Sequence, residues 1–542
     1  MNLSLLSIQN LKIAYKSNYQ NSEENINWVV NDVSFDVEKG EIIALVGESG
    51  CGKSTIGKAI MGLLPAQTRI EGNILFQEES VISYNFRQMR KFRGEGVGLI
   101  FQDPMTRLDP LMTIGEHCRE TIKAHRPDLS SQEIKERVIN TLELVKIPEK
   151  RFSQYPHEFS GGMRQRVAIA LTLVLQPKLI IADEPTTSLD VTISNQILRE
   201  LTTLCKEQEM GLILISHDLN MVGKYGDHIG IMYQGKMVET GMVQDVMNQP
   251  SHDYSKILLN SALHNQEKKE HYLDKEKEKK TTILELKKID KYYSLEPNFI
   301  EQLLGKKTEI IKAVDNINFQ LYEGEIFGLV GESGCGKSTL SRTILQLIKP
   351  TSGQVIFQEK DISILSPRSM LNVRREIQMI FQDPLACLNP LIPIGKAIAE
   401  PLIIHKLGNK TEIRSKVIQM LSKVGLCPPE DYLDRYPKEV SGGQQQRVAI
   451  ARALITNPKL VICDEPVSML DATVQAQVLK LMLALKEEFK LTYLFITHDL
   501  SVARYMCDRI AVMNQGKIVE LAITEEIFTN PQHSYTVQLI NS

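Results

Sequence analysis

The sequence Gly47-Glu48-Ser49-Gly50-Cys51-Gly52-Lys53-Ser54 has the spacing of a phosphate-binding loop, and it recurs residue for residue as Gly331-Glu332-Ser333-Gly334-Cys335-Gly336-Lys337-Ser338. Each copy follows a short apolar run, 41–46 or 325–330, and opens a segment with helical periodicity. A phosphate-binding loop requires this order of strand, loop and helix. A single match could be a simple glycine turn, but two complete copies in the same context predict two nucleotide sites.

The residue types in these loops suit a nucleoside triphosphate. Glycines let successive backbone N–H groups point at the phosphates, next to the positive end of the following helix. Lys53 and Lys337 add a cation, and the hydroxyls of Ser54 and Ser338 can ligate the Mg²⁺ that accompanies the phosphates. We therefore expect ATP and Mg²⁺ as cofactors. Two further candidate contacts follow the loops directly, Thr55 and Thr339.

The composition argues against several classes of function. The 542 residues include 63 basic and 66 acidic side chains, for a net charge of −3, so no overall basic field favours nucleic acid. No apolar run reaches the roughly 20 residues that span a bilayer, and the N-terminus lacks the basic flank of a signal peptide. We expect a soluble or membrane-peripheral protein that binds no nucleic acid.

The eight cysteines lie far apart and form no Cys-x-x-Cys pair, which favours neither a zinc site nor a disulfide framework. Cys51 and Cys335 lie inside the phosphate-binding loops, each beside a lysine and a helix N-terminus. Such surroundings lower the pKa of a thiol. We expect these two thiols to be unusually reactive.

The rest of the chain is duplicated as well. Asp183 and Asp464, for example, lie 281 residues apart (464 − 183 = 281). Between the copies, the charged segment 265–280 is typical of a solvated linker. We therefore predict a first ATPase domain, 1–264, and a second, 281–542. Because so short a linker gives an effective concentration on the order of millimolar, we expect the two domains to pair within one chain.

A helical segment is predicted between the Phe-Gln-Asp-Pro segment and the Ser-Gly-Gly segment of each half. In the first half it begins with the capping-box pattern of Ser130 and Glu133. Apolar residues then follow at helical spacing, which indicates core positions. These residues are Ile134, Val138, Leu142 and Val145 in the first half and Ile413, Val417, Leu421 and Val424 in the second.

Two adjacent carboxylates end a short apolar run in each half, Asp183-Glu184 and Asp464-Glu465. Side chains alternate along a strand, so the two carboxylates are expected to serve different roles. The aspartate suits the Mg²⁺ shell, and the glutamate suits a group that orients or deprotonates the attacking water. After the next apolar run, a histidine could contact the γ-phosphate. These histidines are His217 and His498.

With these motifs the chain resembles the ATP-binding cassette (ABC) family over nearly its whole length. Further matches are the Q-loop residues Gln102 and Gln382, the signature motifs that begin at Ser160 and Ser441, and the D-loops 188–190 and 469–471. The resemblance implies an α/β fold of two tandem ABC-type P-loop NTPase domains. Each would have a RecA-like α/β core, an antiparallel β subdomain and a helical insert.

The resemblance also assigns the remaining site residues. Adenine would stack on Tyr15 and Tyr293, with Trp28 and Tyr292 as alternatives. The proposed metal ligands are Ser54, Gln102, Asp183, Ser338, Gln382 and Asp464. The nucleotide contacts from the signature motifs are Ser160, Gly161, Gly162, Ser441, Gly442, Gly443 and Gln444.

In the ABC family two cassettes pack head to tail, with each ATP between the loop of one cassette and the signature motif of the other. On this chain Lys53, Glu184 and His217 would share a nucleotide with Ser441, and Lys337, Glu465 and His498 would share one with Ser160. Met163 stands where the family usually has glutamine. We expect the ATP site that includes Met163 to remain functional but to hydrolyse ATP at a different rate.

Other segments resemble the peptide/nickel branch of bacterial importers, in particular the fused ATPases of microcin C and glutathione importers. These are the stretches after each Q-loop, 101–110 and 381–390, and the His-x-Tyr motifs at 252–254 and 533–535, where proline is replaced. Many members of this branch continue into a cysteine-rich tail that holds an iron-sulfur cluster. This chain stops at Ser542, so we expect no iron-sulfur cluster.

The resemblance implies an ATP-hydrolysing subunit that lies on the cytoplasmic face of a bacterial inner membrane. Its partners would be two transmembrane permease subunits and a solute-binding protein. The solute is left open among peptides, nickel or metallophores, and glutathione. A soluble two-cassette ATPase acting in translation is the alternative, but the short linker of mixed charge does not suit RNA. An exporter ATPase would leave the importer-like segments unexplained.

Overall fold

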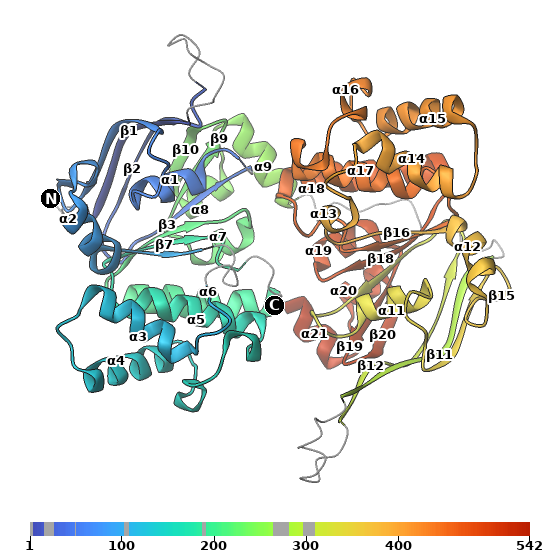
Figure 1. The fold of residues 1–542 in the computed structure, drawn as a ribbon, viewed down its shortest axis with the longest axis horizontal. Helices are drawn as coiled ribbons and strands as arrows, with labels where there is room; N and C mark the ends of the chain where they lie inside the picture. Colours follow the sequence, from blue (N-terminus) through green and yellow to red (C-terminus); the bar gives the residue numbers. More distant parts are fainter. Residues whose placement is uncertain are drawn as a thin grey trace. The chain divides into compact units, whose positions relative to one another are not determined.

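The computed structural model describes residues 4–15, 27–48, 50–101, 108–186, 191–263, 281–295 and 309–541. The chain divides into two compact units, Met1–Leu263 and His264–Ser542, which repeat the same order of elements (Figure 1). The domain borders predicted at 264 and 281 remain predictions, and the predicted linker lies outside the described residues.

The first unit is built on a six-stranded sheet in the order β10-β9-β3-β8-β7-β6. Five of its strands are parallel, and β10 runs antiparallel to β9. Continuous apolar runs such as 42–46 and 179–182 form its central strands, as expected for strands buried on both faces. The strands are β3 (Ile42–Gly47), β6 (Val97–Ile100), β7 (Leu179–Asp183), β8 (Gly211–Ile215), β9 (His228–Tyr233) and β10 (Lys236–Met242).

Side-chain alternation divides this sheet between two cores. Ile181 and Ile213 belong to the core that includes α1 (Lys53–Ile60), and Ile180 and Leu212 belong to the core of the helical insert. Figure 1 shows α1 on one side of the sheet and α5 (Gly161–Leu173) with α6 (Val191–Glu207) on the other. The sheet is therefore the middle layer of a three-layer α/β core.

A separate antiparallel sheet, in the order β2-β1-β4-β5, packs against the α1 side of the core. Its strands are β1 (Leu6–Ala14), β2 (Val30–Val37), β4 (Arg69–Phe76) and β5 (Glu79–Ser80). Strand β2 alternates between buried Val33, Phe35 and Val37 and outward-facing polar residues. This alternation is the pattern of a sheet with one face on the core.

The helical insert contains α3 (Ile114–His125) and α4 (Ser131–Leu144) and packs on α5. The predicted capping box is present: Ser130 Oγ accepts from the Glu133 amide, and the Glu133 carboxylate accepts from the Ser130 amide. The predicted apolar stripe, from Ile134 to Val145, is buried in the core of the insert. In the second unit, Val417, Leu421 and Val424 are buried and Ile413 is partly buried.

The remaining elements of the first unit connect these layers. They are η1 (Val81–Ser83), α2 (Phe86–Lys91), the π-helical turn η2 (Phe92–Gly96), η4 (Glu149–Arg151), η5 (Pro156–Glu158), α7 (Leu219–Tyr225), α8 (Val243–Asn248) and α9 (Asp253–Leu263).

The second unit repeats this architecture, with a main sheet in the order β20-β19-β13-β18-β17-β16 and an antiparallel sheet in the order β12-β11-β14-β15. Its strands are β11 (Thr282–Leu295), β12 (Glu309–Tyr322), β13 (Ile326–Val330), β14 (Ser352–Phe357), β15 (Lys360–Asp361), β16 (Ile377–Ile380), β17 (Leu460–Asp464), β18 (Thr492–Thr497), β19 (Arg509–Asn514) and β20 (Lys517–Ile523). The predicted fold class is thereby confirmed for both units.

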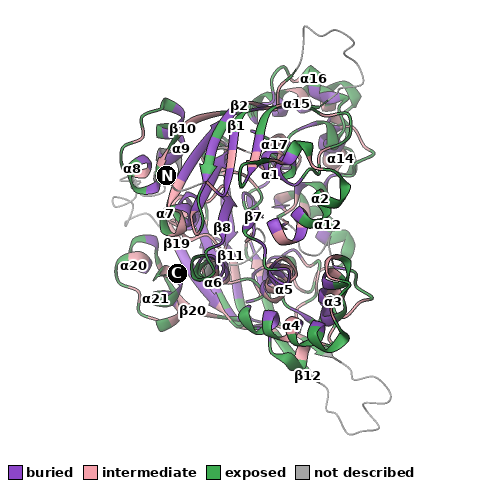
Figure 2. Cartoon of the chain, turned by 90° about the vertical axis from the view of Figure 1, so that its left-hand side faces the viewer, coloured by how far each residue is buried: buried purple, intermediate pink, exposed green. Residues whose placement is uncertain are grey.

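The helices of the second unit follow the same order. They are α11 (Lys337–Ile344), α12 (Pro367–Glu376), α13 (Pro384–Cys387), α14 (Ile394–Ile404), α15 (Lys410–Lys423), α16 (Glu430–Leu433), η7 (Pro437–Glu439), α17 (Gly442–Leu454), α18 (Ala472–Phe489), α19 (Leu500–Met506), α20 (Thr524–Thr529) and α21 (Ser534–Asn541). Figure 2 shows buried strands inside each unit and exposed outer faces on the helices. None of the helices in the described ranges has the length and hydrophobicity needed to cross a membrane.

Candidate ATP sites

Both phosphate-binding loops join the end of a central strand to the first turn of a helix. Gly47 ends β3 with a φ of 148°, and a Cβ there would lie 2.2 Å from the Met232 carbonyl oxygen. Gly331 has the same constraint, with 2.2 Å to the Met513 carbonyl oxygen. Any side chain at either position would displace the loop from the sheet, so this turn requires glycine. Ser49 lies outside the described residues.

The loop lysines are buried and bonded to their own loops. Lys53 is 6% exposed, and its Nζ donates to the carbonyl oxygens of Gly47 at 2.7 Å and Glu48 at 2.9 Å. Lys337 is 5% exposed and donates to the equivalent carbonyls of Gly331 and Glu332 at 2.6 and 2.9 Å. Each loop therefore fixes a cation at the start of a helix, where anions bind.

A serine and an aspartate from different elements meet beside each lysine. Ser54 Oγ on α1 donates to Asp183 Oδ1 at the end of β7, at 2.8 Å. Ser338 Oγ and Asp464 Oδ1 are 3.2 Å apart. Burial raises the pKa of both aspartates, against the effect of the serine hydroxyls. A hydroxyl and a carboxylate are hard oxygen donors of the kind Mg²⁺ prefers.

The glutamate that follows each aspartate lies beside a histidine. Glu184 and Glu465 both have a φ of +48°, and each backbone N–H donates to the adjacent strand, at Ile215 or Ile496. The Glu184 carboxylate lies 3.4 Å from His217 Nδ1. The two carboxylates of this pair therefore face different groups, as expected from their position at the end of a strand.

The second glutamate is the more enclosed of the two. Glu465 is 8% exposed; it lies 3.1 Å from His498 Nδ1 and accepts from Gln382 Nε2 at 2.8 Å. Burial opposes ionisation of Glu465, but His498, Lys337 and Gln382 together lower its pKa. The hydrogen bond to glutamate raises the pKa of His498, as it does for His217. An ionised glutamate beside a proton donor is suited to holding a water molecule.

The structure describes only some of the remaining predicted nucleotide contacts. Gln102 and the D-loop residues 188–190 lie outside the described residues. Tyr15 is 40% exposed, and its hydroxyl lies 3.4 Å from Thr55 Oγ1 at the start of α1. Tyr293 is similarly exposed, with Lys291 Nζ 5.1 Å from its ring centre. The Tyr292 hydroxyl, in contrast, donates to Asp315 at 2.7 Å, so it is engaged within its own sheet.

The two signature motifs differ in how their serines are held. Ser441 caps α17: its Oγ accepts from the Gln444 amide, and the Gln444 side chain accepts from the Ser441 amide at 3.0 Å. Gln444 Nε2 also donates to the Tyr432 hydroxyl at 3.2 Å. Ser160 caps α5 without a side-chain hydrogen bond, and Met163 has no side-chain acceptor for the second bond of a capping box. The Gln444 amide is therefore engaged in capping its own helix.

The prediction of reactive loop thiols is wrong for Cys51. This cysteine is 6% exposed, and burial outweighs the effect of Lys53 and raises the pKa of the thiol. Cys335 is buried to the same extent, at 7%. The nearby ammonium groups are bonded to loop carbonyls, and little of either thiol reaches solvent.

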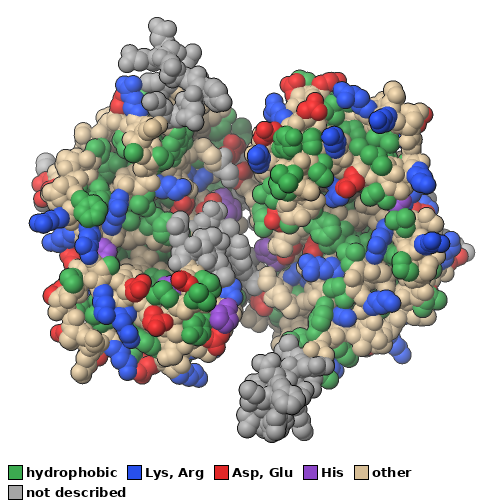
Figure 3. Space-filling view, viewed as in Figure 1, with side chains coloured by type: hydrophobic (Ala, Val, Ile, Leu, Met, Phe, Trp, Pro, Cys, Tyr) green, Lys and Arg blue, Asp and Glu red, His purple; other side chains and the backbone are tan. Residues whose placement is uncertain are grey.

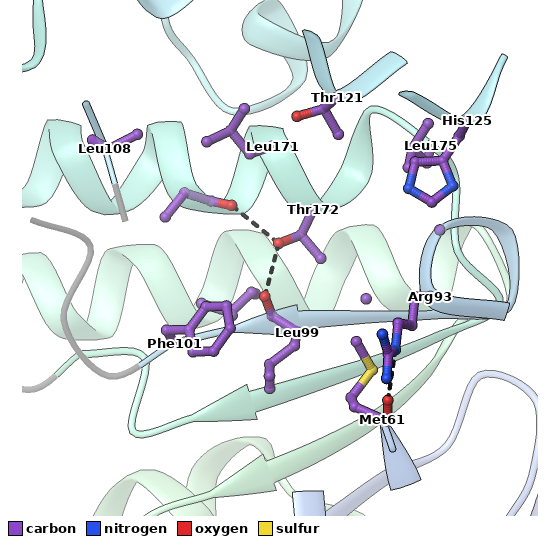
Figure 4. Close-up of a pocket in the computed structure, with 14 residues that line it drawn as sticks. Met61, Arg93, Leu99, Phe101, Leu108, Thr121, His125, Leu171, Thr172 and Leu175 are labelled. Atoms are coloured by element: carbon purple, nitrogen blue, oxygen red, sulfur yellow. Dashed lines mark hydrogen bonds between the residues drawn. The ribbon is translucent and has the colours of Figure 1, made fainter. Parts of the chain in front are cut away.

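A cavity of about 250 Å³ lies in the first unit between β6, α3 and α5 (Figure 4). Its lining is mainly apolar, with Arg93 and His125 among the polar members. Arg93 donates to the Met61 carbonyl at 2.8 Å, and Thr172 donates to Leu99 and Ala168. Among the described residues, none from the phosphate-binding loop lines this cavity.

The comparisons with known proteins agree with this geometry. The ABC transporter family matches residues 30–187 and 314–468, and the family described as oligopeptide/dipeptide transporter, C-terminal region, matches residues 238–294 and 519–542. The chain therefore belongs to the ABC transporter family and is an ABC ATPase with two cassettes. The second family covers both His-x-Tyr motifs, as predicted from their sequence.

Among individual proteins, the chain is similar to the glutathione import ATP-binding protein GsiA of Escherichia coli (strain K12) and of Shigella boydii serotype 4 (strain Sb227). It is 40% identical to each over 567 residues, which covers 99% of this chain and 89% of the relative. Solved structures include the ATP-binding cassette MJ0796 as a post-hydrolysis dimer bound to ADP and Pi, with 33% identity, a TM-score of 0.40, and coverage of 45% of this chain and 99% of the other. The cbiO1 cassette from Clostridium perfringens gives 28% identity, a TM-score of 0.39, and coverage of 48% and 94%.

Sequence reasoning missed two features of the molecule. Glu239 and Glu520, at equivalent positions (520 − 239 = 281), hold the His-x-Tyr motifs. Leu111 and Leu391, also equivalent, are 83% and 82% exposed. A position-by-position comparison of the two halves would have found both pairs, because each occupies the same place in the repeat.

Proposed function

We propose that this protein energises a bacterial importer of peptides or glutathione-type solutes. The observation that carries the proposal is that both units bring a lysine, a serine, an aspartate, a glutamate and a histidine to the carboxyl end of one parallel sheet. The similarity to glutathione import ATP-binding proteins and the C-terminal region of oligopeptide/dipeptide transporters support the importer role and the solute class.

Each ATP is proposed to lie between the loop of one cassette and the signature motif of the other. The lysine and the loop amides would hold the β- and γ-phosphates, and the glutamate would orient the attacking water. The histidine would donate to the γ-phosphate, which suits its raised pKa. Closure of the two cassettes around ATP, followed by hydrolysis and product release, would drive transport.

Ser54 with Asp183, and Ser338 with Asp464, are proposed to hold Mg²⁺ together with the phosphates, and Gln102 and Gln382 would contribute to the same shell. The ion would neutralise charge that builds up on the phosphate oxygens. We propose that no iron-sulfur cluster is bound, which agrees with eight dispersed cysteines, six of them at most 7% exposed. Iron or acid-labile sulfide in pure protein would refute this.

The proposed partners are two transmembrane permeases and a solute-binding protein, with the ATPase on the cytoplasmic face of the inner membrane. Nucleic acid is not an expected partner, and Figure 3 shows basic and acidic side chains interspersed on the face in view. Leu111 and Leu391 are the proposed permease contacts. Each is almost fully exposed in a turn before the helical insert, where Asp109 or Asn389 accepts from its amide.

Replacing both leucines by glutamate tests the permease contact. We expect the permeases to copurify at least about tenfold less with Leu111→Glu/Leu391→Glu than with the unaltered chain, because a charge would have to be buried in an apolar contact. ATP hydrolysis by the isolated chain should not change. Ile257→Glu, at a position on α9 that is 56% exposed, is the control. Undiminished copurification of the permeases would exclude these leucines, and copurifying ribosomes would favour the translation alternative.

A further inference from the structure

The end of each unit is held by a glutamate from the last strand of the main sheet. Glu520 on β20 accepts from the amides of Gln532 and His533, at 2.8 and 3.0 Å. Glu239 on β10 accepts from the amides of Ser251 and His252, at 2.7 and 3.1 Å. Burial opposes ionisation of Glu239, but these bonds and nearby serine hydroxyls lower its pKa to about 2. Both glutamates therefore bind the segment as carboxylates at neutral pH.

The histidine of each motif then fixes the first turn of the terminal helix. His533 Nδ1 accepts from the Tyr535 amide at 3.1 Å, and His252 Nδ1 accepts from the Tyr254 amide at the same distance. With the glutamate on one side and the histidine on the other, the tyrosine backbone is held in one place. The glutamate, the histidine and the tyrosine form a single structural unit in each domain.

In the second unit this structure reaches the phosphate-binding loop. The Tyr535 hydroxyl accepts from the backbone N–H of Glu332, at 3.2 Å and across 203 residues of sequence. The carbonyl oxygen of the same Glu332 accepts from Lys337 Nζ at 2.9 Å. One residue of the loop is thus bonded on its N–H side to the terminal helix and on its carbonyl side to the phosphate-binding lysine.

The first unit supports its tyrosine by a different contact. Tyr254 is 7% exposed, and its ring stacks on Tyr233 with centres 4.2 Å apart. The position equivalent to Tyr233 in the second unit is Asn514 (514 − 233 = 281). At that position the second unit has an amide side chain in place of the ring, and the Tyr535 hydroxyl is bonded to the loop.

We propose that Tyr535 is a positioning residue for the second ATP site: its hydroxyl fixes the Glu332 peptide, so the C-terminal motif sets the affinity of that loop for the phosphates of ATP. This rests on the proposed function of the loop. The terminal His-x-Tyr segment then serves as a brace for the nucleotide site in addition to ending the domain. Glu520 holds the same segment through the amides of Gln532 and His533. Loss of either the Glu520 contacts or the Tyr535 hydroxyl bond is therefore expected to make the phosphate-binding loop less ordered.

The test is Tyr535→Phe in the full chain, in a Lys53→Ala background that restricts ATP binding to the second site. Phenylalanine keeps the ring and removes the hydroxyl that accepts from the Glu332 N–H. We expect the Kd for ATP to rise about three- to tenfold, the effect of one lost hydrogen bond, with the thermal unfolding midpoint unchanged within error. Tyr505→Phe on α19 is the control and should leave the Kd unchanged.

Glu520→Gln provides the second variant. It should raise the Kd in the same direction, and the double variant with Tyr535→Phe should be less than additive, because both act through one segment. A Kd within twofold of the parent for Tyr535→Phe would overturn the inference, as would a Kd change that appears only together with a lower unfolding midpoint. If the Lys53→Ala parent itself binds no ATP, the proposed function of the second loop fails instead.

Discussion

We expect Glu184→Gln/Glu465→Gln to lower ATP hydrolysis at least about 100-fold, while ATP binding stays within about threefold. Glutamine keeps the size of each side chain but loses the charge that is proposed to orient the attacking water, and positioned groups of this kind contribute about 10²- to 10⁴-fold. Glu465 suits this role because its pKa is lowered beside His498 and Lys337, so the group is ionised at neutral pH. Phosphate release and equilibrium ATP binding measure the two quantities separately.

The single variants decide whether the two sites are equivalent. If both sites contribute chemistry, Glu184→Gln and Glu465→Gln each reduce the rate at least twofold. A silent replacement at one position would show that its site does not hydrolyse ATP. Glu488→Gln is the control, because Glu488 forms a surface pair with Lys423 far from the loop in sequence. If the double variant kept more than a tenth of the ATP hydrolysis rate, the glutamates would not have the proposed role.

Lys53→Ala/Lys337→Ala weakens ATP binding by about 10- to 100-fold. The reason is the loss of a buried ammonium at each loop, since hydrogen bonds to charged groups contribute about 1.5–3 kcal/mol each. Both ammonium groups are already fixed by loop carbonyls in this structure, so little ordering is needed when phosphate arrives. Equilibrium binding of labelled ATP measures the effect.

The control for the lysine variants is Lys39→Ala/Lys349→Ala, which removes an exposed lysine shortly before β3 and another shortly after α11. This pair should bind ATP with the affinity of the unaltered chain. Thermal unfolding of the loop variant is measured in parallel, because removing a buried lysine also leaves carbonyls without their donor. ATP binding within twofold of the unaltered chain would contradict the assignment of these loops as phosphate sites.

Much of the fold follows from local sequence patterns. The apolar run that ends at Asp183 forms a buried parallel strand because both of its faces are covered. The helix at Ser131 begins where its capping box places it. Such features depend on residues within a few positions of each other, so the sequence is enough to predict them.

Two further features depend on contacts between residues that are far apart in the sequence. The hydrogen bond from the Glu332 N–H to the Tyr535 hydroxyl joins residues 203 positions apart, and no local sequence pattern predicts it. The thiol of Cys51 was judged from its neighbours in sequence, whereas its pKa is set by burial under the folded loop. In both cases the property depends on residues that come together only when the domain folds.

The central claim is that the two cassettes power import through membrane permeases. The most direct measurement is ATP hydrolysis by the complex purified from gently solubilised membranes and reconstituted in vesicles, with and without glutathione or a peptide and the solute-binding protein. The account predicts two multispanning permeases in the complex and a solute-dependent rise in hydrolysis of at least severalfold. An active ATPase that copurifies with no membrane protein, or with ribosomes, would contradict it.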